Sequence, residues 1–154
     1  MSTMEFIEAP QPRPSLDHSL VEIARKRREQ RDRLVTESES LTIAMVADAR
    51  GTTEDTARQW LHRHRTAGRI VTVQTNDGTT LVPSFQFDLD LDPRQDISDR
   101  TARLVGGGMS PWAVWRWWIS DNPLLDRSPV DALNRSMDDE VDDAVARLLE
   151  TPEA

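Results

Sequence analysis

Arginine and histidine side chains gather in one short stretch of this sequence, and their types match a binding chemistry. Arg58, Arg63 and Arg65 can pair with phosphate groups and read guanine edges bidentately. His62 lies among them, and it does not share a metal site with His64 because positions two apart do not face the same side of a helix. The stretch therefore predicts contact with nucleic acid, although on an isolated helix the same arginines would indicate only a solvated surface.

Aspartates recur further along, at Asp88, Asp90 and Asp92. With Asp99 they faintly resemble a calcium-binding loop, but Pro93 stands where that loop requires glycine and Asp99 where it normally has glutamate. We therefore expect solvated aspartates, no metal site and no cofactor. The sequence has no cysteine, which excludes disulfides, thiolate zinc sites and cysteine nucleophiles. Its three histidines supply no visible catalytic triad, so we do not expect an enzyme.

Four of the five tryptophans fall within seven residues, at Trp112, Trp115, Trp117 and Trp118. On a helix, Trp112, Trp115 and Trp118 share one face while Trp117 projects elsewhere. Two interpretations stay open, because buried aromatic residues usually form a domain's own core and tryptophan is also enriched at interface hot spots. We expect the three that share a face to lie inside and Trp117 to lie at a contact with a partner.

Two short helices and a hairpin are predicted around the basic stretch. Residues 41–50 have the apolar spacing of a helix, which Gly51 can end in the left-handed conformation, and Thr52 or Thr53 can cap the next helix. Residues 76–78, Asn-Asp-Gly, are a hairpin turn signal between two β-branched runs. This is the order of a winged helix-turn-helix, whose second helix enters the major groove while the wing lies along the backbone. The predicted DNA-contacting residues are Thr53, Arg58, His62, Arg63, Arg65 and Arg69.

The remaining segments differ in composition. We expect a disordered tail over 1–14, a charged helix over 15–39, a winged helix-turn-helix over 40–87, an acidic linker over 88–96, and a small helical domain over 97–150. The predicted fold class is mainly α, with one small β-hairpin.

The charge of the chain is distributed unevenly. The net charge is −8, yet residues 22–69 carry 11 basic and 8 acidic groups, a net charge of +3. Residues 70–154 carry 7 basic and 16 acidic groups, a net charge of −9. We therefore expect one part that faces phosphate and one that faces a different partner. No stretch approaches the roughly 18 apolar residues of a membrane span, and no leader pattern is visible, so we expect a cytoplasmic protein.

Two segments of the sequence, taken in order, resemble motifs of a bacterial protein family. Leu81-Val-Pro-Ser-Phe-Gln-Phe87 follows the predicted wing, and Pro111-Trp112 … Trp118 … Asn122-Pro123-Leu-Leu125 … Ser128-Pro129-Val-Asp-Ala-Leu133 comes later. Together they resemble the Xre/MbcA/ParS-type antitoxins over roughly residues 41–150. Two positions depart from that pattern: Asp126 stands where a glycine is usual, and Ser136-Met137 replaces the glycine expected before the last helix.

The resemblance implies an antitoxin. Such proteins cover the active site of a cognate toxin, commonly a RES-domain protein that depletes NAD, and repress their own operon by binding DNA. The toxin-binding residues it implies are Trp112, Trp115, Trp117, Trp118, Asn122, Pro123, Leu125, Pro129, Leu133, Leu148 and Leu149. The acidic C-terminal segment agrees with this role, because acidic side chains complement a basic, anion-binding cleft.

A second hypothesis is a stand-alone transcriptional regulator whose C-terminal domain only dimerises. Under both hypotheses we expect operator double-stranded DNA as a partner. We also expect a homodimer, because a single small reading helix rarely provides enough specificity and two half-sites do.

Overall fold

The computed structural model describes residues 14–150, so the tail predicted over residues 1–14 lies almost entirely outside the described residues. The chain divides into two compact units, Met1–Glu37 and Ser38–Ala154. The described part of the first unit is one helix, α1 (Pro14–Glu37), which confirms the charged helix expected there. None of the described helices is long and apolar enough to cross a membrane.

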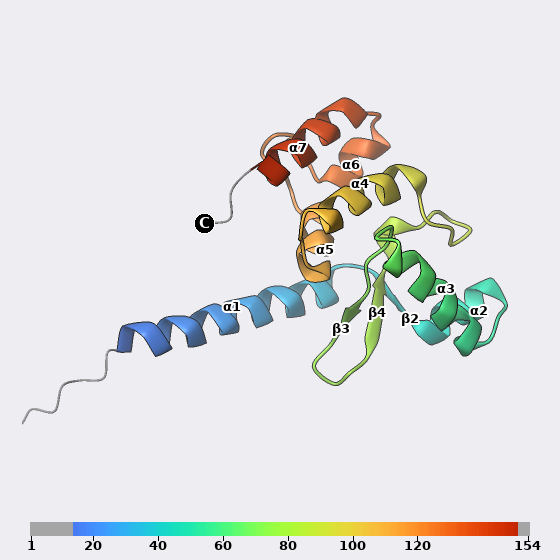
Figure 1. Ribbon diagram of the computed structural model, residues 1–154, viewed down its shortest axis with the longest axis horizontal. Coiled ribbons are helices and arrows are strands. Elements are labelled where there is room, and N and C mark those ends of the chain that lie inside the picture. The colour runs from blue at the N-terminus through green and yellow to red at the C-terminus, as the bar shows by residue number, and fades with distance from the viewer. Residues whose placement is uncertain (1–13, 151–154) are drawn as a thin grey trace, which may run out of the picture. The chain divides into compact units, whose positions relative to one another are not determined.

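The second unit is mainly helical with a small antiparallel sheet, which confirms the predicted fold class (Figure 1). Its elements in chain order are β2 (Ser40–Thr42), α2 (Ile43–Arg50), α3 (Glu54–Thr66), β3 (Val73–Gln74), β4 (Thr80–Pro83), the 3-10 helix η1 (Ser84–Gln86), α4 (Gln95–Gly106), α5 (Pro111–Ile119), α6 (Pro129–Asn134) and α7 (Asp138–Glu150).

Local signals position α2 and α3 as the sequence predicts. Gly51 ends α2 in the left-handed conformation, with φ of 68°. Thr53 caps α3, because its side chain accepts a hydrogen bond from the backbone nitrogen of Thr56 at 3.1 Å. The hairpin between β3 and β4 turns at the predicted residues, where Gly78 has φ of 85°. The order α2, α3, β3, β4 is that of a winged helix-turn-helix.

The predicted start of α2 is wrong, because Leu41 lies in a strand. β2 pairs antiparallel with β4, with Leu41 opposite Val82, so the sheet has the strand order β2-β4-β3. The apolar spacing around Leu41 looks helical in isolation, but pairing with β4 satisfies its backbone groups in extended form. The helix then begins at Ile43, where the Thr42 side chain accepts from the backbone nitrogen of Met45 at 3.2 Å.

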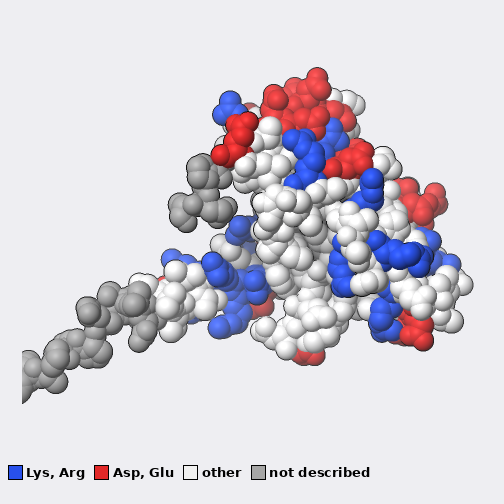
Figure 2. All heavy atoms as spheres, viewed as in Figure 1, with Lys and Arg blue, Asp and Glu red and all other residues white. Residues whose placement is uncertain are grey.

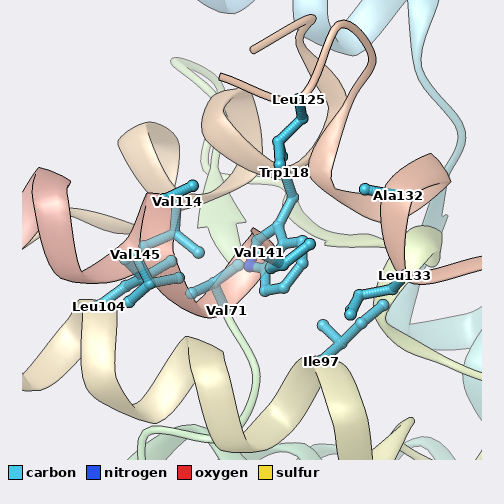
Figure 3. Packing of buried hydrophobic residues seen from close by; sticks show 11 residues of the cluster. Val71, Ile97, Leu104, Val114, Trp118, Leu125, Ala132, Leu133, Val141 and Val145 are labelled. Carbon is cyan, nitrogen blue, oxygen red and sulfur yellow. The ribbon is translucent and has the colours of Figure 1, made fainter. Parts of the chain in front are cut away.

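Two hydrophobic clusters fill the second unit. The winged cluster lies around α2, α3 and β4, and its buried residues are Val46, Ala47, Ala57, Leu61, Ile70, Val82 and Phe87. The helical cluster contains residues of α4, α5, α6 and α7, with Trp118 fully buried and pointing into its centre (Figure 3). Val71, from the segment before β3, also belongs to the helical cluster. The two clusters therefore meet at the segment before β3, where Ile70 belongs to the winged cluster and Val71 to the helical cluster.

A buried glutamine completes this junction. The Gln86 side chain accepts a hydrogen bond from the Val71 nitrogen at 2.9 Å and donates to the Val71 and Pro83 carbonyl oxygens at 2.8 and 3.0 Å. On either side of it, Phe85 packs against the helical cluster and Phe87 belongs to the winged cluster. Ser38–Ala154 thus forms one compact unit, whereas the sequence predicts two domains with an acidic linker.

The helices after the sheet begin at the predicted caps. The Ser110 side chain accepts from the Ala113 nitrogen and the Ser128 side chain from the Asp131 nitrogen, and a proline follows each cap at the first helical position. Asp126 and Ser136 adopt positive φ, 56° and 62°. Both residues therefore hold a backbone conformation that favours glycine.

Candidate nucleic-acid interface

Helix α3 separates an apolar face from a basic face. Ala57 and Leu61 are buried in the winged cluster. Arg58, His62 and Arg65 follow one another at four and then three positions, which places them on one side of the helix, and all three are exposed. This separation lets α3 pack on the domain with one face and present cations with the other.

Short-range contacts hold the basic face in place. An Arg58 Nη1 donates to a carboxylate oxygen of Asp55 at 3.2 Å. Arg65 Nη2 lies 2.9 Å from His62 Nδ1, and the Thr66 hydroxyl lies 3.4 Å from His62 Nε2. These partners all lie on the same helix, so the guanidinium groups can turn toward a ligand without breaking a tertiary contact.

A hollow of about 710 Å³ lies beside this face, between α3 and the hairpin. The residues that line it are Ile43, Asp55, Arg58, Gln59, Leu61, His62, Arg63, Arg65, Thr72, Gln74 and Thr80. Among the described residues of this lining, Asp55 is the one carboxylate, and the hairpin contributes neutral hydrogen-bonding groups. Its charge therefore suits an anion such as a phosphodiester.

The tip of the wing carries the opposite charge. The Asp77 carboxylate accepts hydrogen bonds from the Thr75 hydroxyl and, at 3.1 Å, from the Thr79 nitrogen. The hydrogen bond from Thr75, followed by those from Thr79, lowers the pKa of Asp77 below its ordinary value. The wing can therefore approach phosphate with its strands, at Gln74 and Thr80, but not with its ionised tip.

Trp60 of α3 packs against an arginine and a second aromatic ring. The Arg50 guanidinium lies 3.8 Å from the centroid of the Trp60 ring and donates to the Leu91 carbonyl oxygen at 3.1 Å. Trp60 meets His64 edge-on at 4.7 Å and stacks on Phe87 at 6.1 Å. The separate spacings of these residues gave no signal of this arrangement, because it needs the loop after β4 to fold back on α2.

His64 belongs to this packing around Trp60 rather than to the basic face. Burial, with the neighbouring charges of Arg63, Arg50 and Arg69, lowers the pKa of His64 below its ordinary value. Its ring is half-buried and lies against Trp60.

Four of the six predicted DNA-contacting residues come together in the hollow, namely Arg58, His62, Arg63 and Arg65. The other two, Thr53 and Arg69, are not among its lining residues. Thr53 is exposed at the helix cap. Arg69 Nη1 lies 2.9 Å from a carboxylate oxygen of Asp99, in α4, so this arginine ties the winged part to the helical part.

Five of the eleven residues expected to bind a toxin are buried inside the chain's own core. They are Trp115, Trp118, Leu125, Pro129 and Leu133. The indole nitrogen of Trp118 donates to the buried Thr101 hydroxyl at 3.1 Å, and that of Trp115 donates to the Ser38 hydroxyl at 3.1 Å. In this conformation they are not available to a partner, because they fill the interior that supports the surface.

The other six residues lie at least partly at the surface. Trp112, Trp117, Asn122 and Leu148 are half-buried, and Pro123 and Leu149 are exposed. The expected split of the tryptophans is thus correct for Trp115 and Trp118 and wrong for Trp112, which is only half-buried. Trp112 stacks on Trp115 at 5.7 Å, and Trp117 meets Trp118 edge-on at 5.1 Å.

Asn122 serves the turn before α6, since its side-chain oxygen accepts from the Leu124 nitrogen at 2.9 Å. This turn presents Leu124, which is 54% exposed and which the sequence did not single out. Acidic side chains gather over the C-terminal helices (Figure 2), with Asp138, Asp139 and Glu140 in the first turn of α7. The surface here therefore combines apolar and acidic groups.

In residues 14–150, no group of three or more histidine or carboxylate side chains is arranged to hold a metal ion.

No protein-family model matches the sequence, and no curated protein matches it. The chain is similar to one solved structure, the NMR structure of Rv2175c, with a TM-score of 0.58 and 20% sequence identity. That similarity covers 73% of this chain and 82% of the other, and at this identity it concerns the fold alone.

Proposed function

We propose that this chain is a cytoplasmic DNA-binding regulator that reads its operator with α3 and the wing, and that its C-terminal helices make it the antitoxin of a toxin-antitoxin pair. The observation that carries the DNA-binding half is the hollow beside α3, where arginine and histidine side chains face neutral donors of the hairpin.

The dimensions of α3 suit a duplex groove. A helix with its side chains is about 10–12 Å across, and the major groove of B-DNA is about 12 Å wide. Arg58, His62 and Arg65 lie on the side that would enter the groove, where arginine pairs bidentately with guanine. A backbone strand that leaves the groove would then pass through the hollow, beside Gln74 and Thr80 of the wing.

The DNA-binding half is tested with the DNA immediately upstream of the chain's own reading frame. Fluorescence anisotropy should show tighter binding to this DNA than to a scrambled duplex, by roughly 10³-fold or more at physiological salt. Asp55→Asn should increase the affinity for both duplexes, because it removes the carboxylate that lies beside Arg58. Equal affinity for the two duplexes, or no binding, would contradict operator recognition.

The antitoxin half is supported by sequence order and by backbone conformation. The first resembling segment falls on β4 and η1, and the second covers α5, the turn after it and the start of α6. Asp126 and Ser136 hold the left-handed conformation that glycine adopts readily. The proposed toxin-binding surface consists of Trp112, Trp117, Pro123, Leu124, Leu148 and Leu149, together with the acidic side chains at the start of α7. Apolar side chains beside acidic ones suit a partner with a basic, apolar-lined cleft.

Coexpression with the product of the adjacent gene tests this half. The chain should restore growth that the neighbouring product inhibits, and the two proteins should copurify. Leu124→Ser should weaken the complex while the thermal unfolding temperature stays close to that of the unaltered chain, because Leu124 is exposed. A chain that neither restores growth nor copurifies with its neighbour would be a stand-alone regulator instead.

A further inference from the structure

Helix α1 contributes little apolar packing within its unit. The burial of its side chains is described from Ser19 to Glu37, and every one of them is exposed or half-buried. Three of its apolar residues face solvent, with Leu20 59%, Val21 65% and Ile23 45% exposed. A 24-residue helix with this exposure is expected to serve an external partner or to remain solvated.

The central part of α1 is strongly basic. Residues 25–33 contain six basic and two acidic groups, a net charge of +4, over about 12 Å of helix. Glu22 and Glu29 both pair with Arg25, so one arginine takes up two of the nearby carboxylates. Lys and Arg atoms are prominent along this part of the helix (Figure 2).

The cations do not form a stripe. At about 100° per residue, the basic side chains of residues 25–33 are distributed around the whole circumference of the helix. A membrane surface requires an apolar face opposite the charges, which this arrangement does not provide. Pairing with a second α1 would bring two stretches of net charge +4 together, which electrostatic repulsion opposes.

A duplex groove complements a helix that carries cations around its whole circumference, because both walls of the groove carry phosphates. Resting on the proposed DNA-binding function, we propose that residues 25–33 of α1 form a second DNA-contacting element that binds the phosphate backbone. Because phosphate contacts carry no direct sequence information, this element raises affinity for any duplex and leaves the discrimination to α3.

The test compares two triple variants of the full chain. Lys26, Arg27 and Arg28 are changed to glutamine, which preserves helix propensity, and helicity is checked by circular dichroism. The matched control changes three exposed arginines of the second unit to glutamine, so that both variants lose three positive charges. These arginines are Arg103, Arg116 and Arg135. Affinity for the upstream duplex and for the scrambled duplex is measured from about 50 to about 200 mM salt, a range over which phosphate contacts change affinity strongly.

For the α1 variant, the slope of log affinity against log salt should become less negative by about 0.9 for each lost phosphate contact. Affinity for both duplexes should fall by the same factor, so that their ratio is unchanged. The control should keep the slope of the unaltered chain.

Equal slopes for the α1 variant and the unaltered chain would overturn the inference while leaving the function of α3 intact. An unchanged slope together with loss of a dimer, measured by light scattering, would also overturn it and would assign α1 to pairing between copies. If the unaltered chain binds neither duplex, the proposed function fails as well, so the two failures are distinguishable.

Discussion

Arg58 and Arg65 differ from other arginines of the winged part in what their side chains contact. Their partners, Asp55 and His62, lie on the same helix. Arg50 instead covers Trp60, and Arg69 reaches into α4 through its ion pair with Asp99. Arginines bound to distant elements hold the fold together, whereas those bound locally remain able to meet a ligand.

His64 makes stability depend on pH. Its pKa is lowered in the folded chain, so folding favours the neutral ring. Stability is therefore fully present above the unfolded pKa of about 6.5 and is lost as the pH falls below it toward the lower folded value. Thermal unfolding should show a decrease in stability from about pH 7.5 to about pH 5.5, a window above the ordinary carboxylate pKa values. His64→Phe, which keeps a ring against Trp60, should reduce this decrease, and an equal decrease in the variant would contradict the assignment.

Ser136 occupies a backbone conformation that favours glycine, with φ of 62°. Ser136→Gly should therefore increase the free energy of unfolding by about 0.5–1 kcal/mol, since relief of the left-handed conformation exceeds the added entropy of the unfolded chain. Ser120, at the end of α5, has φ of −95° and offers a matched control. Ser120→Gly should not stabilise the chain, and equal effects in both variants would show that the conformation at Ser136 carries no cost.

Helix α3 depends on its N-terminal cap. The Thr53 side chain satisfies a backbone nitrogen in the first turn of the helix that presents the basic face. Thr53→Ala should lower the free energy of unfolding by about 1 kcal/mol, whereas Thr53→Ser should retain most of it. Urea unfolding measures both, and an alanine variant as stable as the unaltered chain would mean that the cap contributes nothing.

Signals confined to a few residues predicted these elements well. Gly51 and Thr53 acted as expected, because a helix end depends mainly on its own neighbours. Strand β2 was missed, because its extended form depends on β4, about forty residues away along the chain. The role of Gln86 was missed for the same reason, since its partner Val71 lies in another segment.

The candidate site was predictable to a similar degree. The basic face of α3 follows from helical spacing alone, so Arg58, His62, Arg63 and Arg65 were found together. The ion pair of Arg69 and the exposure of Leu124 follow from tertiary packing, which spacing does not report. Burial of Trp115 and Trp118 could not be separated from a partner contact, because both outcomes use the same apolar helix face.

The second unit, Ser38–Ala154, should unfold cooperatively as a whole. Val71 and Phe85 connect the winged part to the helical cluster that contains Trp118. Trp118→Ala should lower the free energy of unfolding by about 3–5 kcal/mol and expose amides of α3 as well as those of α5. Hydrogen exchange checks this directly. Continued protection of α3 in the variant while α5 exchanges would show two independent domains.

The salt dependence of DNA binding tests most directly whether α3 and its hollow form a DNA interface. Arg58→Gln with Arg65→Gln removes two charges from that face, and Arg103→Gln with Arg135→Gln removes two charges that pair with Asp142 and Asp131. For the first pair, the salt slope on upstream DNA should become less negative by about 0.9 per lost phosphate contact, and affinity should fall about tenfold or more. The second pair should bind as the unaltered chain does. Equal slopes and affinities for the two pairs would mean that the basic face of α3 does not contact DNA.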